Sequence, residues 1–262
     1  MRKSAIPNLF TISNLACGFV SIHYAANGKL VAAAWLIVIA AFLDAFDGKL
    51  ARLIDSEADS GVFGLQFDSL ADVCSFGVAP GVLMLHYLHS LVNLTWLPLI
   101  AAFLFLLSGA YRLARFNTRH VEEAEVEVEV EVEVEAVVDD DEQEMKPDFV
   151  GLPIPVAATT LCSFVIFSQR VWESTREPHV GLSLCVLLAI LMISPFDYPA
   201  FPRFTFETVR DRFRIALSLG AMVVIFSNTE AIFFPVTLAF CLSGAIRWLV
   251  HQVRHREVVD LR

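Results

Sequence analysis

The sequence lacks the signatures of several large classes of enzyme. Its five cysteines have neither metal-ligand spacing nor paired spacing, so we expect neither a zinc site nor a disulfide framework. Its seven histidines form no ligand cluster, and the chain has no glycine-rich phosphate loop and no Ser-His-Asp order. The formal net charge of −10 gives no reason to expect a nucleic-acid partner. These absences argue against zinc enzymes, P-loop nucleotidases and triad hydrolases.

Apolar residues, by contrast, are abundant. Of the 262 residues 56% are hydrophobic and the mean hydropathy is +0.61, which is typical of a polytopic membrane protein. A membrane-spanning helix needs about 20 mostly apolar residues. By this template we predict an all-α fold, with one integral membrane domain over 1–262 that forms a bundle of about eight transmembrane helices. The predicted spans are 7–26, 30–52, 66–90, 95–115, 152–170, 180–196, 212–228 and 230–250.

Positive charge is distributed unevenly over the segments between these predicted spans. With a cytoplasmic N-terminus, sixteen of the 19 Lys and Arg residues lie on the cytoplasmic side, and only Lys29, Arg170 and Arg176 lie outside. This asymmetry fits the positive-inside rule. We therefore expect a multi-pass protein of the cell (cytoplasmic) membrane with both termini in the cytoplasm.

A low-complexity acidic segment separates the fourth and fifth predicted spans. Glutamate and valine alternate from Glu125 to Glu135, and a run of acidic residues follows at 139–142. Strict alternation can indicate a strand with one valine face. However, closely spaced like charges repel, and acidic tracts of this kind usually stay disordered. We therefore predict that 121–146 is a disordered cytoplasmic loop without a catalytic part.

An acidic pattern runs along two neighbouring predicted helices. In the segment DAFDGKLAR, five positions recur at spacings that share one face of a helix. In the segment GLQFDSLAD, three positions four residues apart form a second stripe. Two helices facing each other across these stripes would gather four carboxylates around a small space floored by glycines. The positions are Asp44, Asp47, Gly48, Ala51 and Arg52 in the first segment, and Gly64, Asp68 and Asp72 in the second.

Four aspartates in a membrane protein need a compensating charge. A charged residue at the bilayer centre costs ~2.5–3.5 kcal/mol, so four uncompensated aspartates would cost about 10 kcal/mol, comparable to the stability of a whole domain. Hard divalent cations prefer carboxylate oxygens, so we predict a site for Mg²⁺ or Mn²⁺. Lys49 and Arg52 then remain for an anionic substrate such as a diphosphate. The alternative is that some of the aspartates are solvated helix ends or caps.

The two segments together resemble the signature of the CDP-alcohol phosphatidyltransferases. The resemblance implies an integral membrane enzyme with a six-helix core, here with two further helices, that transfers a phosphatidyl group from a CDP-linked lipid to an alcohol. The signature has eight fixed positions and is highly specific. One departure is the spacer of eleven residues, 53–63, which is longer than the family's usual spacer. This departure concerns the shape of the turn, which Asp55, Glu57 and Asp59 suit.

Three further segments, SFGVAP at 75–80, YRLARFN at 111–117 and GLPIP at 151–155, resemble the phosphatidylserine synthase branch of that family. This likeness implies transfer to the hydroxyl of L-serine with release of CMP, in phospholipid biosynthesis. The charge asymmetry described above predicts that the active site faces the cytoplasm. A bacterial source would imply a diacylglycerol lipid and an archaeal source an archaeol lipid. The resemblance also implies a homodimer, which small residues on the helix faces favour.

The resemblance gives the residues of the signature their expected roles. Four aspartates are expected to hold one or two divalent ions, and the last of them is also the candidate base for the serine hydroxyl. Gly48, Ala51 and Gly64 leave room for the nucleotide, and Arg52 pairs with the diphosphate or closes the pocket. The metal ligands are Asp44, Asp47, Asp68 and Asp72, with Asp72 as the base.

Two assignments outside the signature rest on physical arguments. Arg112 and Arg115 lie three residues apart on one helix face, so either could bind the serine carboxylate, although arginines at a helix end are often only membrane anchors. Asn14 lies inside the first apolar span. It either bonds to neighbouring helices or contacts the nucleotide or its diphosphate.

Two other functions stay open at this point. The first is the same chemistry with glycerol 3-phosphate or inositol phosphate as the acceptor, which would need further cationic residues. The second is an ion or metal transporter, since transporters also place aspartates in membrane helices. A transporter would be expected to show inverted repeats, whereas the clustered aspartates here all lie in one half of the chain.

Overall fold

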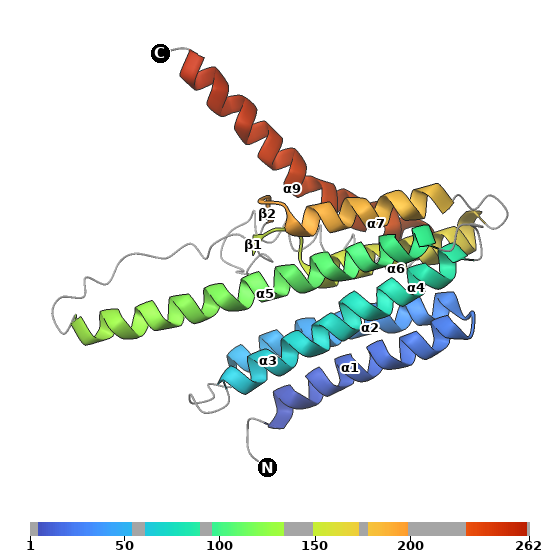
Figure 1. Ribbon diagram of the computed structural model, residues 1–262, viewed down its shortest axis with the longest axis horizontal. Helices are drawn as coiled ribbons and strands as arrows, with labels where there is room; N and C mark the ends of the chain where they lie inside the picture. Colours follow the sequence, from blue (N-terminus) through green and yellow to red (C-terminus); the bar gives the residue numbers. More distant parts are fainter. Residues whose placement is uncertain are drawn as a thin grey trace, which may run out of the picture.

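The computed structural model is a bundle of long helices, from which α9 and the C-terminal part of α5 extend outward (Figure 1). It describes residues 5–53, 61–89, 96–133, 149–172, 178–198 and 229–260. The helices are α1 (Ala5–Ala26), α2 (Leu30–Leu53), α3 (Gly61–Asp72), η1 (Val73–Val78), α4 (Ala79–His89), α5 (Trp96–Glu133), α6 (Ile154–Phe167), η2 (Ser168–Trp172), α7 (Pro178–Ile193) and α9 (Thr229–Asp260). Two short strands, β1 (Phe149–Val150) and β2 (Asp197–Tyr198), pair antiparallel.

The described part of the chain is that of a helical membrane protein, as the sequence predicts. Five of its helices are long and apolar enough to cross a membrane, and the apolar segments Leu30–Phe46 and Pro178–Ile193 are shorter. The five are Leu9–Ala26, Phe63–His89, Trp96–Thr118, Ile154–Trp172 and Glu230–Val250. The predicted span 212–228 lies outside the described residues. The count of eight spans and the orientation of the termini therefore stay predictions.

Helix α5 differs from the sequence prediction at its C-terminal end. We expected the span to close near residue 115 and the acidic segment 121–146 to be a disordered loop, but α5 continues to Glu133. Glutamate is a good helix former, and residues added to an existing helix avoid the cost of nucleation. The start of the acidic segment is therefore helical. Residues 134–148 lie outside the described part of the chain.

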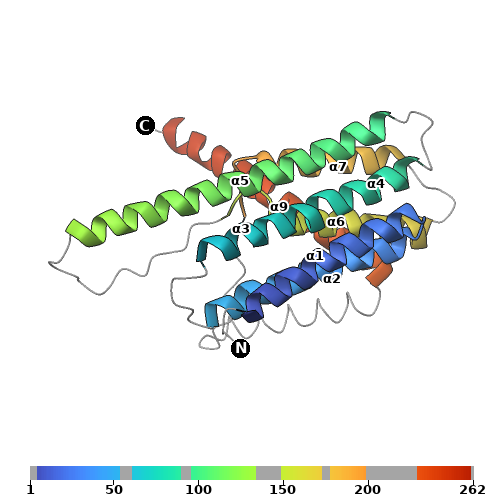
Figure 2. The same cartoon turned by 60° about the horizontal axis from the view of Figure 1, so that its bottom comes forward.

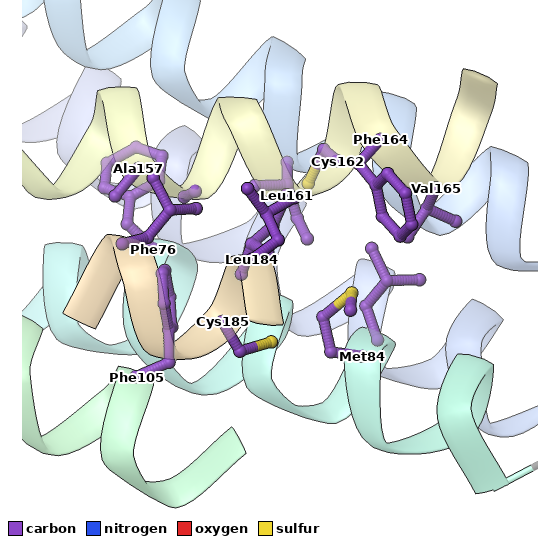
Figure 3. Close-up of a cluster of buried hydrophobic side chains, with 14 of the residues drawn as sticks. Phe76, Met84, Phe105, Ala157, Leu161, Cys162, Phe164, Val165, Leu184 and Cys185 are labelled. Atoms are coloured by element: carbon purple, nitrogen blue, oxygen red, sulfur yellow. The ribbon is translucent and has the colours of Figure 1, made fainter. Parts of the chain in front are cut away.

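Helix α6 is the centre of the packed apolar core. Its buried side chains belong to the same cluster as those of η1, α4, α5 and α7, and Figure 3 shows Phe76, Met84, Phe105, Leu161 and Cys185 among the side chains that fill the space between these helices. Burial of a large apolar side chain stabilises a fold by about 1.5–3 kcal/mol in water, and in lipid close packing takes over this role. This core holds together the helices that carry the polar site at one end.

A close approach fixes α1 against η1. A Cβ atom added at Gly18 would lie 2.7 Å from the Cα atom of Ser75, which is closer than a methyl group can come. The Ser75 hydroxyl donates a hydrogen bond to the carbonyl oxygen of Asn14 at 3.0 Å. Small residues permit such backbone contact between membrane helices. The first helix is therefore locked to the turn that follows Asp72.

The β1–β2 ladder connects the start of α6 to α9. The backbone N–H of Gly151 donates to the carbonyl oxygen of Phe196 at 2.8 Å, and Gly151 has a φ of +84°, a conformation that other residues rarely adopt. The Tyr198 hydroxyl donates to the carbonyl oxygen of Cys241 at 2.8 Å, and its ring lies against Gly244. The GLPIP segment is thus held in one position at the end of the core.

Candidate active site

Three of the four predicted carboxylates come together at one end of the bundle. Asp44 on α2 and Asp68 and Asp72 on α3 each offer a carboxylate oxygen, and these oxygens lie within 4.8 Å of one another. Figure 2 shows the C-terminal end of α2 and the beginning of α3 at the same end of the molecule. The two stripes recognised in the sequence therefore face a common point.

The fourth carboxylate and four other predicted residues lie on the last turns of α2. The backbone of this helix is continuous to Leu53, so Asp44 and Gly48, four residues apart, share one face. The side chains of Asp47, Lys49, Ala51 and Arg52 lie outside the described part of the structure. Their predicted roles therefore stay predictions.

Gly64 lies on α3, one helical turn before Asp68. A Cβ atom built at this position would meet no other atom of the described residues within 4 Å. The glycine is therefore not needed for helix packing, in contrast to Gly18. Open space one turn from the Asp68 carboxylate is what a bound nucleotide would need.

Asp72 is the most enclosed of the three carboxylates. It is the last residue of α3, directly before the π-helical turn η1, and only 7% of it is exposed. One of its oxygens, Oδ1, accepts a hydrogen bond from the Asn14 amide at 3.2 Å. The charges of Asp44, Asp68 and Arg112 also act on it. π-Helical turns occur frequently at functional sites, where they redirect side chains.

The structure separates the two candidate arginines. Arg112 is 7% exposed, interacts electrostatically with Asp72, and has a buried Nε atom with no hydrogen-bond partner among the described residues. Arg115 instead reaches toward the GLPIP segment, where its Nη2 atom lies 3.2 Å from the position that a Cβ would take at Gly151. Arg112 is therefore the arginine with an electrostatic interaction to Asp72 and an unpartnered buried donor.

Sequence reasoning missed the residues that brace this site. The hydroxyl of Ser69 and the amide of Asn117 are hydrogen-bonded, with Asn117 Nδ2 donating to Ser69 Oγ at 2.9 Å, which ties α3 to α5. Ser75 holds the backbone of Asn14 in the same way. Asn117 lies in the segment YRLARFN and Ser75 in SFGVAP, but nothing in their spacing indicates their partners.

The donor set suits a hard divalent cation. Three carboxylates within 4.8 Å of one another repel unless a positive charge lies between them, and carboxylate oxygens are the ligands that Mg²⁺ and Mn²⁺ prefer. No cysteine or histidine belongs to this group of three, so a soft-metal site is not formed by the described residues. An oxygen-only set of this kind fits both ions.

The residues of this site lie within a stretch that matches a known protein family. The family model described as CDP-alcohol phosphatidyltransferase matches residues 4–194, a stretch that contains every residue of the site from Asn14 to Arg115. The chain belongs to the CDP-alcohol phosphatidyltransferase family. The resemblance of the sequence segments to this family is thereby confirmed. Membership of the family explains why a carboxylate cluster lies at the end of apolar helices.

Individual relatives point to one branch of this family. The chain is 34% identical over 257 residues to the CDP-diacylglycerol–serine O-phosphatidyltransferase of Helicobacter pylori, a match that covers 95% of this chain and 92% of that protein. It is 32% identical over 195 residues to the archaetidylserine synthase of Methanothermobacter thermautotrophicus, covering 74% and 70%. It is 31% identical over 205 residues to the CDP-diacylglycerol–serine O-phosphatidyltransferase of Bacillus subtilis, covering 78% and 95%.

Proposed function

We propose that this membrane protein transfers a phosphatidyl or archaetidyl group from a CDP-linked lipid to the hydroxyl of L-serine and releases CMP. The single observation that carries the proposal is the convergence of Asp44, Asp68 and Asp72 in a chain of this family. The names of its relatives, which include both serine O-phosphatidyltransferases and an archaetidylserine synthase, support serine as the acceptor. The reaction belongs to phospholipid biosynthesis, and we assign it to the cytoplasmic face of the cell membrane.

The carboxylates are assigned to a divalent cation. Asp44, Asp68 and Asp72, joined by Asp47 from the same face of α2, would hold Mg²⁺ or Mn²⁺. When bound, the cation supplies positive charge beside the diphosphate of the CDP-lipid, which stabilises the charge that develops on the leaving group. Removal of divalent ions is therefore expected to abolish turnover.

The chemical step is an in-line exchange at the phosphorus atom that carries the lipid. The serine hydroxyl oxygen forms a new bond to this phosphorus while its proton passes to the Asp72 carboxylate. The anhydride bond to the CMP oxygen breaks, and CMP leaves with the electron pair. Asp72 suits the role of base because it is the most buried carboxylate and because Asn14 holds one of its oxygens.

The nucleotide is assigned to the side of the site formed by the glycines. Gly48 and Ala51 on α2 and Gly64 on α3 leave room for the cytidine, and the open space around Gly64 supports this. Arg52, one residue beyond Ala51, pairs with the diphosphate. Larger side chains on these faces would occupy the space that the nucleotide needs.

The acceptor is assigned to the α5 side of the site. A carboxylate on the acceptor needs a cationic partner, and the unpartnered Nε of Arg112 beside Asp72 supplies one. Arg115 is turned toward Gly151 and is the less suitable of the two. A homodimer forms part of the proposal, which a mass measurement of the detergent-solubilised protein would test.

The proposal is tested by CMP release from purified protein. CDP-diacylglycerol and CDP-archaeol are supplied with L-serine, glycerol 3-phosphate, inositol phosphate or no acceptor, with Mg²⁺, Mn²⁺ or a chelator. We expect release that requires both serine and a divalent ion, and the two lipids distinguish the tail types. Release with another acceptor but not with serine would move the protein to another branch. No release with any acceptor, together with ion uptake in proteoliposomes, would favour a transporter.

A further inference from the structure

The side chain of Asn14 leaves one atom without a partner beside the proposed base. Asn14 is fully buried, its amide nitrogen donates to Asp72 Oδ1, and its carbonyl oxygen Oδ1 has no hydrogen-bond partner among the described residues. The NH₂ group faces Asp72, because Asn14 Nδ2 lies 3.2 Å from the Asp72 Oδ1 atom that accepts its hydrogen bond. The carbonyl oxygen is consequently directed to the other side of the amide.

A buried carbonyl oxygen without a donor is unusual and calls for an explanation. Flexibility does not provide one, because the Asn14 backbone is fixed by the hydroxyl of Ser75 and α1 touches η1 at Gly18. The polar atom is therefore held in place before any ligand arrives. Preorganisation of this kind is what a binding group needs.

A second unpartnered atom lies on another side chain that interacts with Asp72. Arg112 Nε is a buried donor without a partner, and Asn14 Oδ1 is a buried acceptor without a partner. Among the described residues these are the two buried side-chain atoms that lack partners, and both side chains interact with Asp72. An amino acid such as serine has one group for each of them. Its carboxylate suits the unpartnered donor, its ammonium suits the unpartnered acceptor, and its hydroxyl suits the base.

We propose that Asn14 Oδ1 accepts a hydrogen bond from the α-ammonium group of the acceptor amino acid. The inference rests on the proposed function and refines it. Arg112 holds the carboxylate of the zwitterion, Asn14 its ammonium, and Asp72 its hydroxyl. From the sequence, contact with the nucleotide was one of two alternatives for Asn14. The proposal assigns Asn14 to the acceptor instead, as a residue that determines acceptor specificity.

The test compares two acceptors that differ only in the ammonium group. CMP release is measured with L-serine and with 3-hydroxypropanoate, which keeps the hydroxyl and the carboxylate. The ratio of the two kcat/KM values is the readout, because it does not depend on the fraction of folded enzyme. We expect Asn14→Ala to reduce the preference of the wild type for serine by about tenfold to a hundredfold, the loss typical of a hydrogen bond to a charged group.

Two variants accompany Asn14→Ala. Asn14→Asp keeps an acceptor oxygen but loses the N–H donor to Asp72, so we expect it to retain the preference for serine while kcat falls. Ser13→Ala is the matched control, because among the described residues its hydroxyl donates to the carbonyl oxygen of Leu9 at 2.8 Å, within α1. It should change neither the ratio nor kcat. The concentration of Mg²⁺ that gives half-maximal activity is measured in parallel for every variant.

Each outcome decides between specific alternatives. If Asn14→Ala lowers kcat/KM equally for both acceptors, Asn14 positions Asp72 and the ammonium assignment is wrong. If the ratio is unchanged but the Mg²⁺ requirement rises, Asn14 Oδ1 binds the cation and the assignment is again wrong. If the wild type shows no serine-dependent release of CMP, the proposed function itself fails, and this inference fails with it.

Discussion

Two regions of this molecule differ in whether their buried polar groups have hydrogen-bond partners. Between α6 and α9 the buried hydroxyls have partners: Thr160 donates to the carbonyl oxygen of Val156 at 2.8 Å and meets the Cys241 sulfur at 3.2 Å, and the hydroxyls of Ser163 and Thr237 lie 2.9 Å apart. At the carboxylate end, two buried atoms of Asn14 and Arg112 have none among the described residues, and three carboxylates face one another.

The difference distinguishes a scaffold from a binding site. Polar groups in membrane helices are stable when neighbouring helices satisfy them, and the α6–α9 region shows this arrangement. Groups left unsatisfied in the same protein lower its stability unless a ligand completes them. The polar groups at the carboxylate end therefore need a bound ligand to complete their interactions. Those between α6 and α9 are satisfied by protein groups. The following predictions test this contrast, beginning with the largest effect.

Replacement of Asp72 by asparagine is expected to have the largest effect. The amide would keep the shape of the side chain but could not take the serine proton, so kcat should fall by about 10²–10⁴-fold. Binding of the CDP-lipid should stay within a few-fold of the wild type. Rapid-quench measurement of CMP release and equilibrium binding of labelled CDP-lipid would separate the two quantities. Full activity of this variant would remove Asp72 from the role of base.

Asp68→Asn should act through the cation instead. Loss of one charged ligand is expected to raise the concentration of Mg²⁺ or Mn²⁺ for half-maximal activity by about 10–100-fold, at least the effect of losing a supporting group around a metal. Saturating metal should restore part of the rate. Ser69→Ala, one residue away, is the comparison variant, because it removes the hydrogen bonding to Asn117 that braces the site but no charged ligand. An unchanged metal requirement in Asp68→Asn would contradict the cation site.

The two arginines should differ in their effect on serine. Arg112→Ala is expected to raise the KM for serine by about 10–100-fold, because a charge-assisted hydrogen bond to the carboxylate is lost, while the KM for the CDP-lipid stays unchanged. Arg115→Ala, whose guanidinium lies at Gly151, should have a smaller effect on that KM. Titration of serine at saturating CDP-lipid provides the comparison. If both variants kept the wild-type KM, the carboxylate would be bound elsewhere.

The smallest effect is expected in the α6–α9 region. Thr160→Val removes a hydroxyl whose partners are a carbonyl oxygen of its own helix and Cys241, and should cost ~0.6 kcal/mol, the typical value of such a bond between membrane helices. Activity and both KM values should match the wild type. Thermal unfolding in detergent measures the stability change. A loss of activity without a loss of stability would show that this region is more than a scaffold.

Much of the helix pattern could be predicted from the sequence because it follows from composition over one segment at a time. The first two spans were expected at 7–26 and 30–52 and are observed at Ala5–Ala26 and Leu30–Leu53. Helical spacing placed Asp44 on one stripe and Asp68 and Asp72 on another, and the resemblance to the family implied that the two stripes share a metal site. Local periodicity is sufficient when the residues that meet come from consecutive helices.

Other features of the site depend on contacts between distant segments, which the periodicity of the sequence does not predict. The partner of Asn14 is Asp72, 58 residues away, and Ser69 meets Asn117 across 48 residues. The choice between Arg112 and Arg115 depends on how α5 is rotated against α3 and the Gly151 turn. The extension of α5 to Glu133 was missed because charge repulsion was given more weight than the helix propensity of glutamate.

The six-residue turn η1, Val73–Val78, has a consequence for the whole third span. A π-helical turn accommodates one surplus residue, so α4 is rotated relative to the direction that α3 would have given it. Deleting a single residue from 73–78 would restore ordinary winding and turn everything beyond it by about 100°. Asp72 could then no longer face Asn14 while Phe76 and Met84 face α6. The orientation of Asp72 toward the site and the packing of Phe76 and Met84 against α6 therefore both depend on this π-helical turn.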